Sequence, residues 1–180
     1  MSAARKTVLC LSGSLRQRSA NTAALQAAQA LAPSTLELVI YDGLGDLPPF
    51  NPDVETVAVP AVVLALREKV GQADALLIAC PEYAHGVPGV FKNLLDWLVG
   101  SLELPDKPVA LLNASGRGSH HAQDALAEIL QTMSARVLGG ASGNVALPGA
   151  GCTREDVLAS PERCAELHGL LAALEHALFA

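Results

Sequence analysis

Aromatic residues are scarce in this chain, and no segment is both long and apolar. Phe, Trp and Tyr make up 3% of the 180 residues while 51% are hydrophobic, so Ala, Val and Leu must supply the core. A chain with that much apolar surface can bury enough of it to fold, which argues against disorder. The most apolar stretch, 57–66, contains Pro60 and is followed by Arg67, so it is too short and too interrupted for a transmembrane helix.

An excess of basic charge is lacking as well. The 12 Lys and Arg residues stand against 18 Asp and Glu residues, which gives a net charge of −6, and the cations are scattered singly. Such a distribution does not suit the backbone of a nucleic acid. His120 and His121 are adjacent, but no Cys or carboxylate lies at ligand spacing from them. We therefore expect no nucleic-acid partner, no membrane span and no metal site.

The four cysteines form no CxxC pair. Cys10 and Cys80 lie inside apolar runs and are predicted to be small core residues, whereas the sequence assigns no role to Cys152 or Cys164. The apolar run at 7–12 leads directly into Gly and Arg, which indicates a first strand and not a signal peptide. The expected location is the cytoplasm.

Apolar runs of strand length alternate with helical patterns along residues 1–180, which is the length of a single domain. We expect strands at 7–12, 36–41, 73–80 and 108–114 and a weaker one within 136–147. We expect helices at 21–31, 60–71, 87–100, 122–133 and 161–178. The segment 42–60 is rich in Gly, Pro and Asp and is predicted to be a long surface loop.

Strands that alternate with helices predict an α/β fold with a parallel sheet, covered by helices on both faces. Ligands of such sheets bind outside the carboxyl ends of the strands. The loops that follow the first, third and fourth strands, at 12–19, 81–86 and 115–121, are also the most unusual in composition. They are the predicted site.

The first loop combines hydroxyls, amides and a guanidinium between a strand and a helix. A helix N-terminus offers free N–H groups and a positive dipole end, which together suit a phosphate. The predicted phosphate-binding residues are Ser12, Ser14, Arg16, Ser19, Asn21 and Thr22. The alternative is that Ser19 only caps the helix and the rest is a polar turn. The loop is neither GxxxxGK[ST] nor GxGxxG, which argues against a nucleoside triphosphate or a Rossmann dinucleotide site.

Two motifs carry a resemblance to a known family. The sequence SGSLRxxSxNT after the first strand, and PEY followed by PG and KNxxDW after the third, resemble the NAD(P)H-dependent FMN reductases. The likeness covers roughly residues 7–135. It implies a flavodoxin-like three-layer sandwich whose five-stranded parallel sheet has the order 2-1-3-4-5.

The resemblance also implies flavin mononucleotide (FMN) as bound cofactor and NADPH or NADH as co-substrate. The acceptor would be a small molecule such as a quinone, a flavin, an azo compound or chromate. Because this family's site lies between subunits, we expect a homodimer or homotetramer, with the apolar third helix as a plausible contact surface.

By resemblance, the second and third loops would line the flavin ring. The residues concerned are Pro81, Glu82, Tyr83, Ala84, His85 and Gly86 in the second loop, and Ser115, Gly116 and Arg117 in the third. Ala84 departs from the family pattern, which has Asn there. The alternative for the third loop is a glycine-rich turn with an exposed arginine.

No catalytic side chain is named, since the redox chemistry belongs to the flavin. Two other functions stay open. One is a flavodoxin-type electron carrier that uses no nicotinamide, against which the scarcity of aromatics argues. The other is a binding or regulatory protein that kept the fold and lost the cofactor.

Overall fold

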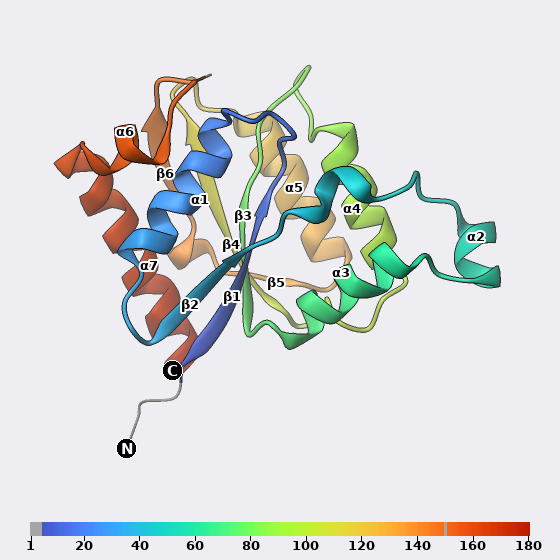
Figure 1. The fold of residues 1–180 in the computed structure, drawn as a ribbon. Coiled ribbons are helices and arrows are strands. Elements are labelled where there is room, and N and C mark those ends of the chain that lie inside the picture. The colour runs from blue at the N-terminus through green and yellow to red at the C-terminus, as the bar shows by residue number, and fades with distance from the viewer. Residues whose placement is uncertain (1–4, 150) are drawn as a thin grey trace.

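The computed structural model of the protein describes residues 5–149 and 151–180. Their strands form a parallel sheet with the order β2-β1-β3-β4-β5, and β6 pairs with β4 (Figure 1). The strands are β1 (Lys6–Ser12), β2 (Leu36–Ile40), β3 (Ala75–Ala79), β4 (Pro108–Ser115), β5 (Arg136–Val137) and β6 (Gly143–Leu147). The predicted strand order is confirmed.

Helices cover both faces of the sheet. They are α1 (Ala20–Leu31), α2 (Pro52–Val57), α3 (Ala61–Gln72), α4 (Gly89–Val99), α5 (His120–Thr132), α6 (Arg154–Leu158) and α7 (Pro161–Phe179), with short 3-10 turns η1 (Gly43–Asp46) and η2 (Gly139–Ala141). Helices α1, α6 and α7 pack on one face, and α3, α4 and α5 pack on the other (Figure 1). The predicted three-layer α/β sandwich is therefore confirmed.

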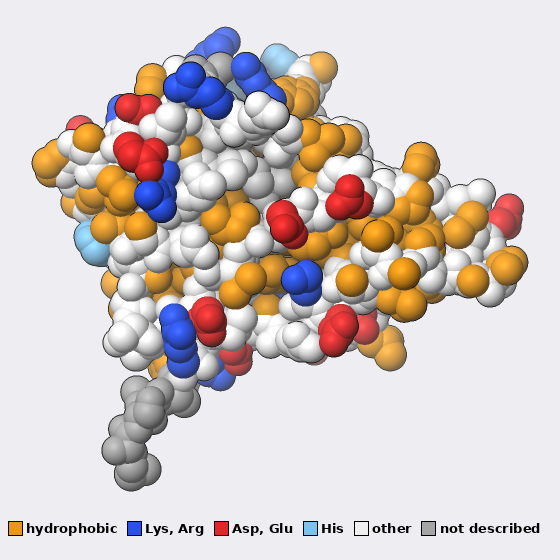
Figure 2. Space-filling model, viewed as in Figure 1, with side chains coloured by type: hydrophobic (Ala, Val, Ile, Leu, Met, Phe, Trp, Pro, Cys, Tyr) orange, Lys and Arg blue, Asp and Glu red, His pale blue; other side chains and the backbone are white. Residues whose placement is uncertain are grey.

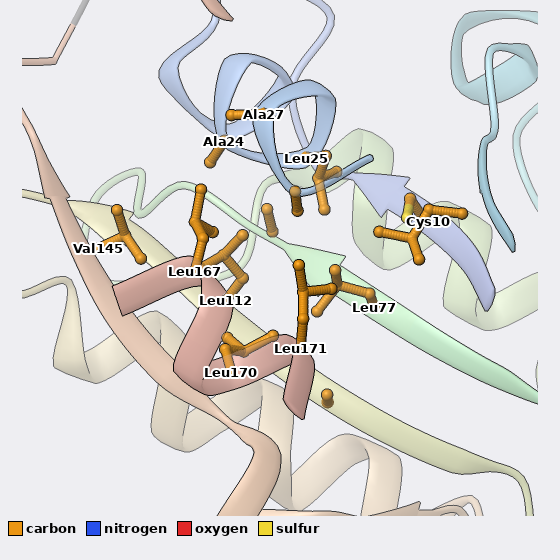
Figure 3. Close-up of a cluster of buried hydrophobic side chains, with 14 of the residues drawn as sticks. Cys10, Ala24, Leu25, Ala27, Leu77, Leu112, Val145, Leu167, Leu170 and Leu171 are labelled. Atoms are coloured by element: carbon orange, nitrogen blue, oxygen red, sulfur yellow. The ribbon is translucent and has the colours of Figure 1, made fainter. Parts of the chain in front are cut away.

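Each face of the sheet has its own apolar core, because successive strand residues point to opposite sides. In β1, Cys10 belongs to the core under α1 and α7, and Leu11 belongs to the core under α3 and α4. Figure 3 shows Leu167 and Leu171 of α7 directed at strand residues such as Leu112. Small alanines on α1 help to fill the first of these cores, and aliphatic side chains on the strands fill both, so few aromatics are needed.

The predicted core cysteines are buried. The exposed fraction is 0% for Cys10 and 1% for Cys80, and burial raises the pKa of each thiol to about 12. Neither thiol is therefore a nucleophile near neutral pH. Phe91 and Trp97 of α4 are also fully buried, so both belong to the core of this chain.

The predicted fifth strand is divided in two. β5 pairs with β4 at Pro108 and Val109, and β6 pairs with it from Leu112 onward. Between them the chain makes the turn η2, which contains two glycines, 139 and 140. Glycines favour such a break over a continuous strand.

The prediction of a long surface loop at 42–60 is partly wrong. The segment contains η1 and α2, and Leu44 and Leu47 are buried. It is fixed to α4 by Trp97, whose indole N–H donates to the carbonyl of Pro48 at 2.8 Å and whose ring meets Phe50 edge-on at 5.0 Å. Because Gly, Pro and Asp dominate the composition of this segment, the sequence pattern did not indicate the few apolar side chains that anchor it.

Helix α6 has no counterpart among the predicted elements. The Thr153 hydroxyl accepts from the N–H of Asp156, and the Asp156 carboxylate accepts from the N–H of Thr153, which forms a capping box. Across the described residues, no helix is long and apolar enough to cross a membrane.

Candidate functional site

A cavity of about 530 Å³ opens where β1, β3, β4 and β6 reach their carboxyl ends. Four loops line it, namely those that follow these four strands. Its size is typical of sites for small molecules and cofactors. The position follows from the parallel sheet, because all these strands end at the same edge (Figure 1).

The structure brings most of the predicted site residues to this cavity. Those that line it are Ser14, Arg16, Ser19, Asn21, Pro81, Glu82, Tyr83, Ser115, Gly116 and Arg117. Ser12 and Thr22 do not line it, and their hydroxyls are hydrogen-bonded to each other at 2.8 Å. Ala84, His85 and Gly86 form the tip and end of a hairpin and also lie outside the lining.

The N-terminus of α1 points polar backbone groups into the cavity. Ser19 is the N-cap, and its hydroxyl accepts weakly from the N–H of Thr22 at 3.5 Å. Ala20 and Asn21 also line the cavity, and their N–H groups have no acceptor among the described residues. Ser19 therefore caps the helix and lines the cavity at once, so the two interpretations of this residue do not exclude each other.

Three arginines line the same cavity, although the chain as a whole is acidic. They are Arg16, Arg18 and Arg117. Figure 2 shows Lys and Arg side chains gathered at the top of the molecule, over the loops at the carboxyl ends of the strands. Arg18 donates to the carbonyl of Gly151 at 2.8 Å, whereas the guanidinium groups of Arg16 and Arg117 have no acceptor among the described residues. This concentration of positive charge favours an anionic ligand.

The second loop is a tight hairpin. Tyr83 and Gly86 exchange two backbone hydrogen bonds, at 3.1 and 3.0 Å, around Ala84 and His85. Both central residues have positive φ, at 50° and 60°, as a two-residue turn of type I′ requires. Asn tolerates this left-handed conformation better than Ala does. The departure of Ala84 from the family pattern therefore puts a strained residue in the turn.

Glu82 joins the second loop to the third. Its carboxylate oxygen Oε2 accepts from the N–H of Ala122 at 3.0 Å, in the first turn of α5. The N-cap of that helix, Ser119, has φ 48° and makes no side-chain cap bond, so Glu82 supplies the missing acceptor. The imidazole of His85 also stacks on that of His121, with centroids 4.3 Å apart. Two separate contacts thus hold these walls together.

Asn113 shapes the third loop. Its side-chain oxygen accepts from the N–H of Ser115 at 3.1 Å, and its amide donates to the carbonyl of Gly118. Gly116 is needed where the chain passes close to β6, because a Cβ there would lie 2.8 Å from the carbonyl oxygen of Leu147. Sequence reasoning placed Asn113 inside a strand and missed this supporting role.

Several lining residues were not among the individual site residues predicted, although Arg18 and Ser119 lie within the predicted loops. They are Arg18, Ala20, Ala114, Ser119, Leu147, Pro148 and Gly149. The last three follow β6, whose position within 136–147 was not resolved from the sequence. The Pro-Gly pair that follows this strand was the available signal, since it marks a turn at the same edge of the sheet.

Three histidines lie close together beside the second and third loops. His85, His120 and His121 are exposed, and the rings of His120 and His121 lie 4.0 Å apart in a tilted stack. Over the ranges that the structure describes, no group of three His, Cys, Asp or Glu residues is placed to hold a metal ion.

The strand order and the cavity at the carboxyl ends of the central strands define a flavodoxin-like domain. The sequence profile of one family, described as NADPH-dependent FMN reductase, matches residues 7–147. This chain therefore belongs to the NADPH-dependent FMN reductase family.

Individual relatives agree with this membership. An NAD(P)H-dependent FMN reductase of Pseudomonas aeruginosa is 43% identical over 127 residues, which are 68% of either chain. A quinone reductase of Escherichia coli K12 is 39% identical over 104 residues, 57% of this chain and 54% of that one, so the match spans only about half of that relative. The solved structure of FerB, a flavoenzyme NAD(P)H:(acceptor) oxidoreductase of Paracoccus denitrificans, has a TM-score of 0.73 at 28% identity and covers 95% of this chain and 98% of its own.

The resemblance predicted from the two loop motifs is confirmed by the family match. The family match and the relatives also confirm the expected class of enzyme, an NAD(P)H-dependent flavin oxidoreductase, and the expected cofactors, FMN and NAD(P)H. The match extends over β1 to β6, so all four loops that line the cavity are included or adjoin it.

Replacing Ala84 tests the strain in the hairpin. We expect Ala84→Asn and Ala84→Gly to raise the free energy of unfolding by about 0.5–1 kcal/mol, because both residues adopt positive φ more readily. Ala84→Val should lower it, since a β-branched residue fits this conformation worst. Urea unfolding of the three variants measures the order, and a valine variant as stable as the glycine variant would contradict a left-handed turn.

Proposed function

We propose that this protein binds FMN in the cavity at the carboxyl end of its sheet and uses it to carry electrons from NAD(P)H to a small acceptor. The observation that supports this most directly is the asymmetry of the cavity. At one side lie the first N–H groups of α1, which have no acceptor in the part of the chain that the structure describes, with Ser14, Ser19 and Arg16 close by. At the other lie the backbone segments that begin at Pro81 and Ser115.

The residues present fit a phosphate at the α1 side. A phosphomonoester needs several donors at once, and a helix N-terminus with an unpaired guanidinium beside it provides them. Asn21 adds a side-chain amide, and no described residue takes its hydrogen bonds. In this proposal, Arg16 pairs with the phosphate, and the half-buried hydroxyl pair of Ser12 and Thr22 braces the loop.

The second and third loops fit the polar edge of a flat ring. Pro81, Glu82 and Tyr83 would present backbone groups from one side, and Ser115, Gly116 and Arg117 would do so from the other. Glu82 joins the two segments through the N–H of Ala122, and Asn113 fixes the turn of the third loop, both through bonds that use no ligand. FMN, when bound, supplies the redox chemistry by taking hydride from NAD(P)H and passing electrons to the acceptor.

The side chains need only bind and orient, and no acid or base is assigned. Tyr83 is 52% exposed, which leaves its ring at the open rim where a second molecule would enter. For the acceptor we propose a small oxidised organic molecule, with a quinone favoured by the name of the Escherichia coli relative. A flavin, an azo compound and chromate stay open. The location in the cytoplasm stays a prediction of the sequence.

We also propose a homodimer or homotetramer, and we place the contact between subunits on α2 and α3 instead of on α4, the helix that the sequence favoured. Most apolar residues of α4 are buried inside the chain, and only Val90 and Val99 are exposed, so this helix offers little to a partner. Exposed apolar side chains gather instead on α2 and α3, where Figure 2 shows them together, and include Val57 and Leu64 at 87% and 53% exposure.

Sedimentation equilibrium tests the proposed contact surface by comparing the wild type with the double variant Val57→Asp and Leu64→Asp. Only the wild type should associate, because the two carboxylates would be buried without partners in the contact. A double variant that associates like the wild type would contradict a contact on α2 and α3.

Anaerobic addition of NADPH to the purified protein tests the function. We expect a yellow preparation whose flavin absorbance bleaches with NADPH or NADH and returns when a quinone is added. A flavin that does not bleach with either nicotinamide would identify an electron carrier. A colourless protein that binds no added FMN would identify a binding protein that has lost the cofactor.

Arg16→Ala tests the phosphate assignment. We expect FMN binding to weaken by about 1.5–3 kcal/mol, the range for hydrogen bonds to charged groups, because the phosphate loses its charged donor. Riboflavin lacks the phosphate, so its affinity should hardly change. Fluorescence titration of both ligands gives the comparison, and equal losses for the two would contradict the assignment.

A further inference from the structure

Gly13 and Cys80 meet at the point where the first and second loops leave the sheet. The N–H of Gly13, directly after β1, donates to the carbonyl of Ala79, the last residue of β3, at 2.8 Å. The pairing of the two strands thus continues one residue into the first loop. The next residue along each loop, Ser14 in one and Pro81 in the other, lines the cavity at the carboxyl end of the sheet.

The space beside Gly13 is filled by the second loop. A Cβ at this position would lie 2.8 Å from Sγ of Cys80, 3.1 Å from Cδ of Pro81 and 3.2 Å from Cα of Cys80. The shortest of these distances is about 1 Å less than an ordinary van der Waals separation. The φ of Gly13 is not in the left-handed region, so glycine is needed here for space and not for its backbone freedom.

Cys80 contributes the size of its side chain to this contact. The side chain is 1% exposed, and its S–H donates weakly to the carbonyl of Pro81 at 3.5 Å. Burial raises the pKa of the thiol to about 12, so it stays neutral and behaves as a small hydrophobic group. Because Gly13 packs directly against it, the volume at position 80 limits how closely the first loop approaches the second.

We propose that Cys80, packed against Gly13, is a positioning residue that sets the spacing between the first and second loops, and that this spacing makes the site favour FMN over riboflavin. The inference rests on the proposed function, because it takes the phosphate to lie at the first loop and the flavin ring at the second. FMN has to reach both loops at once, so its affinity depends on the distance between them. Riboflavin lacks the phosphate, so a shift of the first loop affects it less.

Titration of FMN and riboflavin against the wild type, Gly13→Ala and Cys80→Val tests the proposal. Each variant enlarges one side of the contact and pushes the two loops apart. We expect each to weaken FMN binding by about tenfold and riboflavin binding by less than about threefold, as for an overpacked contact that moves one loop. The ratio of the two affinities, measured by flavin fluorescence, is the readout, because a general loss of folding would lower both alike.

Cys10→Val is the matched control. Cys10 is also a fully buried thiol, but it belongs to the core on the opposite face of the sheet from Cys80. The same substitution there should lower the free energy of unfolding, since it overpacks a core, without changing the ratio of the two affinities. Urea unfolding and the same flavin titrations measure both quantities.

The double variant Gly13→Ala with Cys80→Ala tests the contact itself. Cys80→Ala removes Sγ, the nearest of the three atoms that the new Cβ would meet. Gly13→Ala should therefore weaken FMN binding at least about threefold less in the Cys80→Ala background than in the wild type, which is the coupling expected of residues in contact.

The outcomes separate the inference from the function it rests on. If the wild type binds no FMN, the proposed function fails. If it binds FMN, three results each overturn the role of Cys80: equal losses for the two ligands in Gly13→Ala and Cys80→Val, the same change of ratio in Cys10→Val, or no coupling between positions 13 and 80. Circular dichroism of each apoprotein shows whether a lost affinity reflects lost folding.

Discussion

Burial of both faces of a parallel sheet is the constraint on which this structure depends. Because α1 and α7 cover one face and α3, α4 and α5 the other, both faces of the sheet are closed to a ligand, which leaves the loops at the ends of the strands to bind one. All strands run the same way, so the loops after β1, β3, β4 and β6 meet at one edge. The distribution of Ala, Val and Leu through the chain thus decides where the cavity lies.

At that edge, hydrogen bonds from side chains to the backbone fix the loops that form the walls of the cavity. Glu82 caps α5 from the neighbouring hairpin, and Asn113 fixes the turn that follows its own strand. These bonds involve protein groups alone, so the walls are formed before any ligand arrives. A preformed cavity lowers the entropy that a ligand loses on binding.

Local sequence patterns predicted most of the strands and most of the residues that line the cavity. Continuous apolar runs located β1 to β4, and the polar composition of the loops after β1, β3 and β4 located most of the cavity lining. Two family motifs gave the strand order and the class of enzyme, which the family match supports. The role of Arg16 at a phosphate stays a prediction.

What the sequence did not predict depends on residues far apart in the chain. Glu82 finds its partner 40 positions away, and Arg18 finds Gly151 at a separation of 133. No local pattern encodes such a pair. The division of the last strand into β5 and β6 also depends on distant residues. The two pieces pair with different parts of β4, and the two glycines of η2 lie between them. The buried leucines of 42–60 were likewise hidden among turn residues.

The division of that strand also affects how the molecule meets other chains. A long, straight outer strand exposes a row of unpaired N–H and C=O groups, which can recruit strands from other molecules and start aggregation. Here β5 has two residues and β6 has five, with η2 between them. Among the described residues, that border of the sheet therefore presents two short segments to another strand in place of one long template, and the glycines at 139 and 140 lie at the break between them.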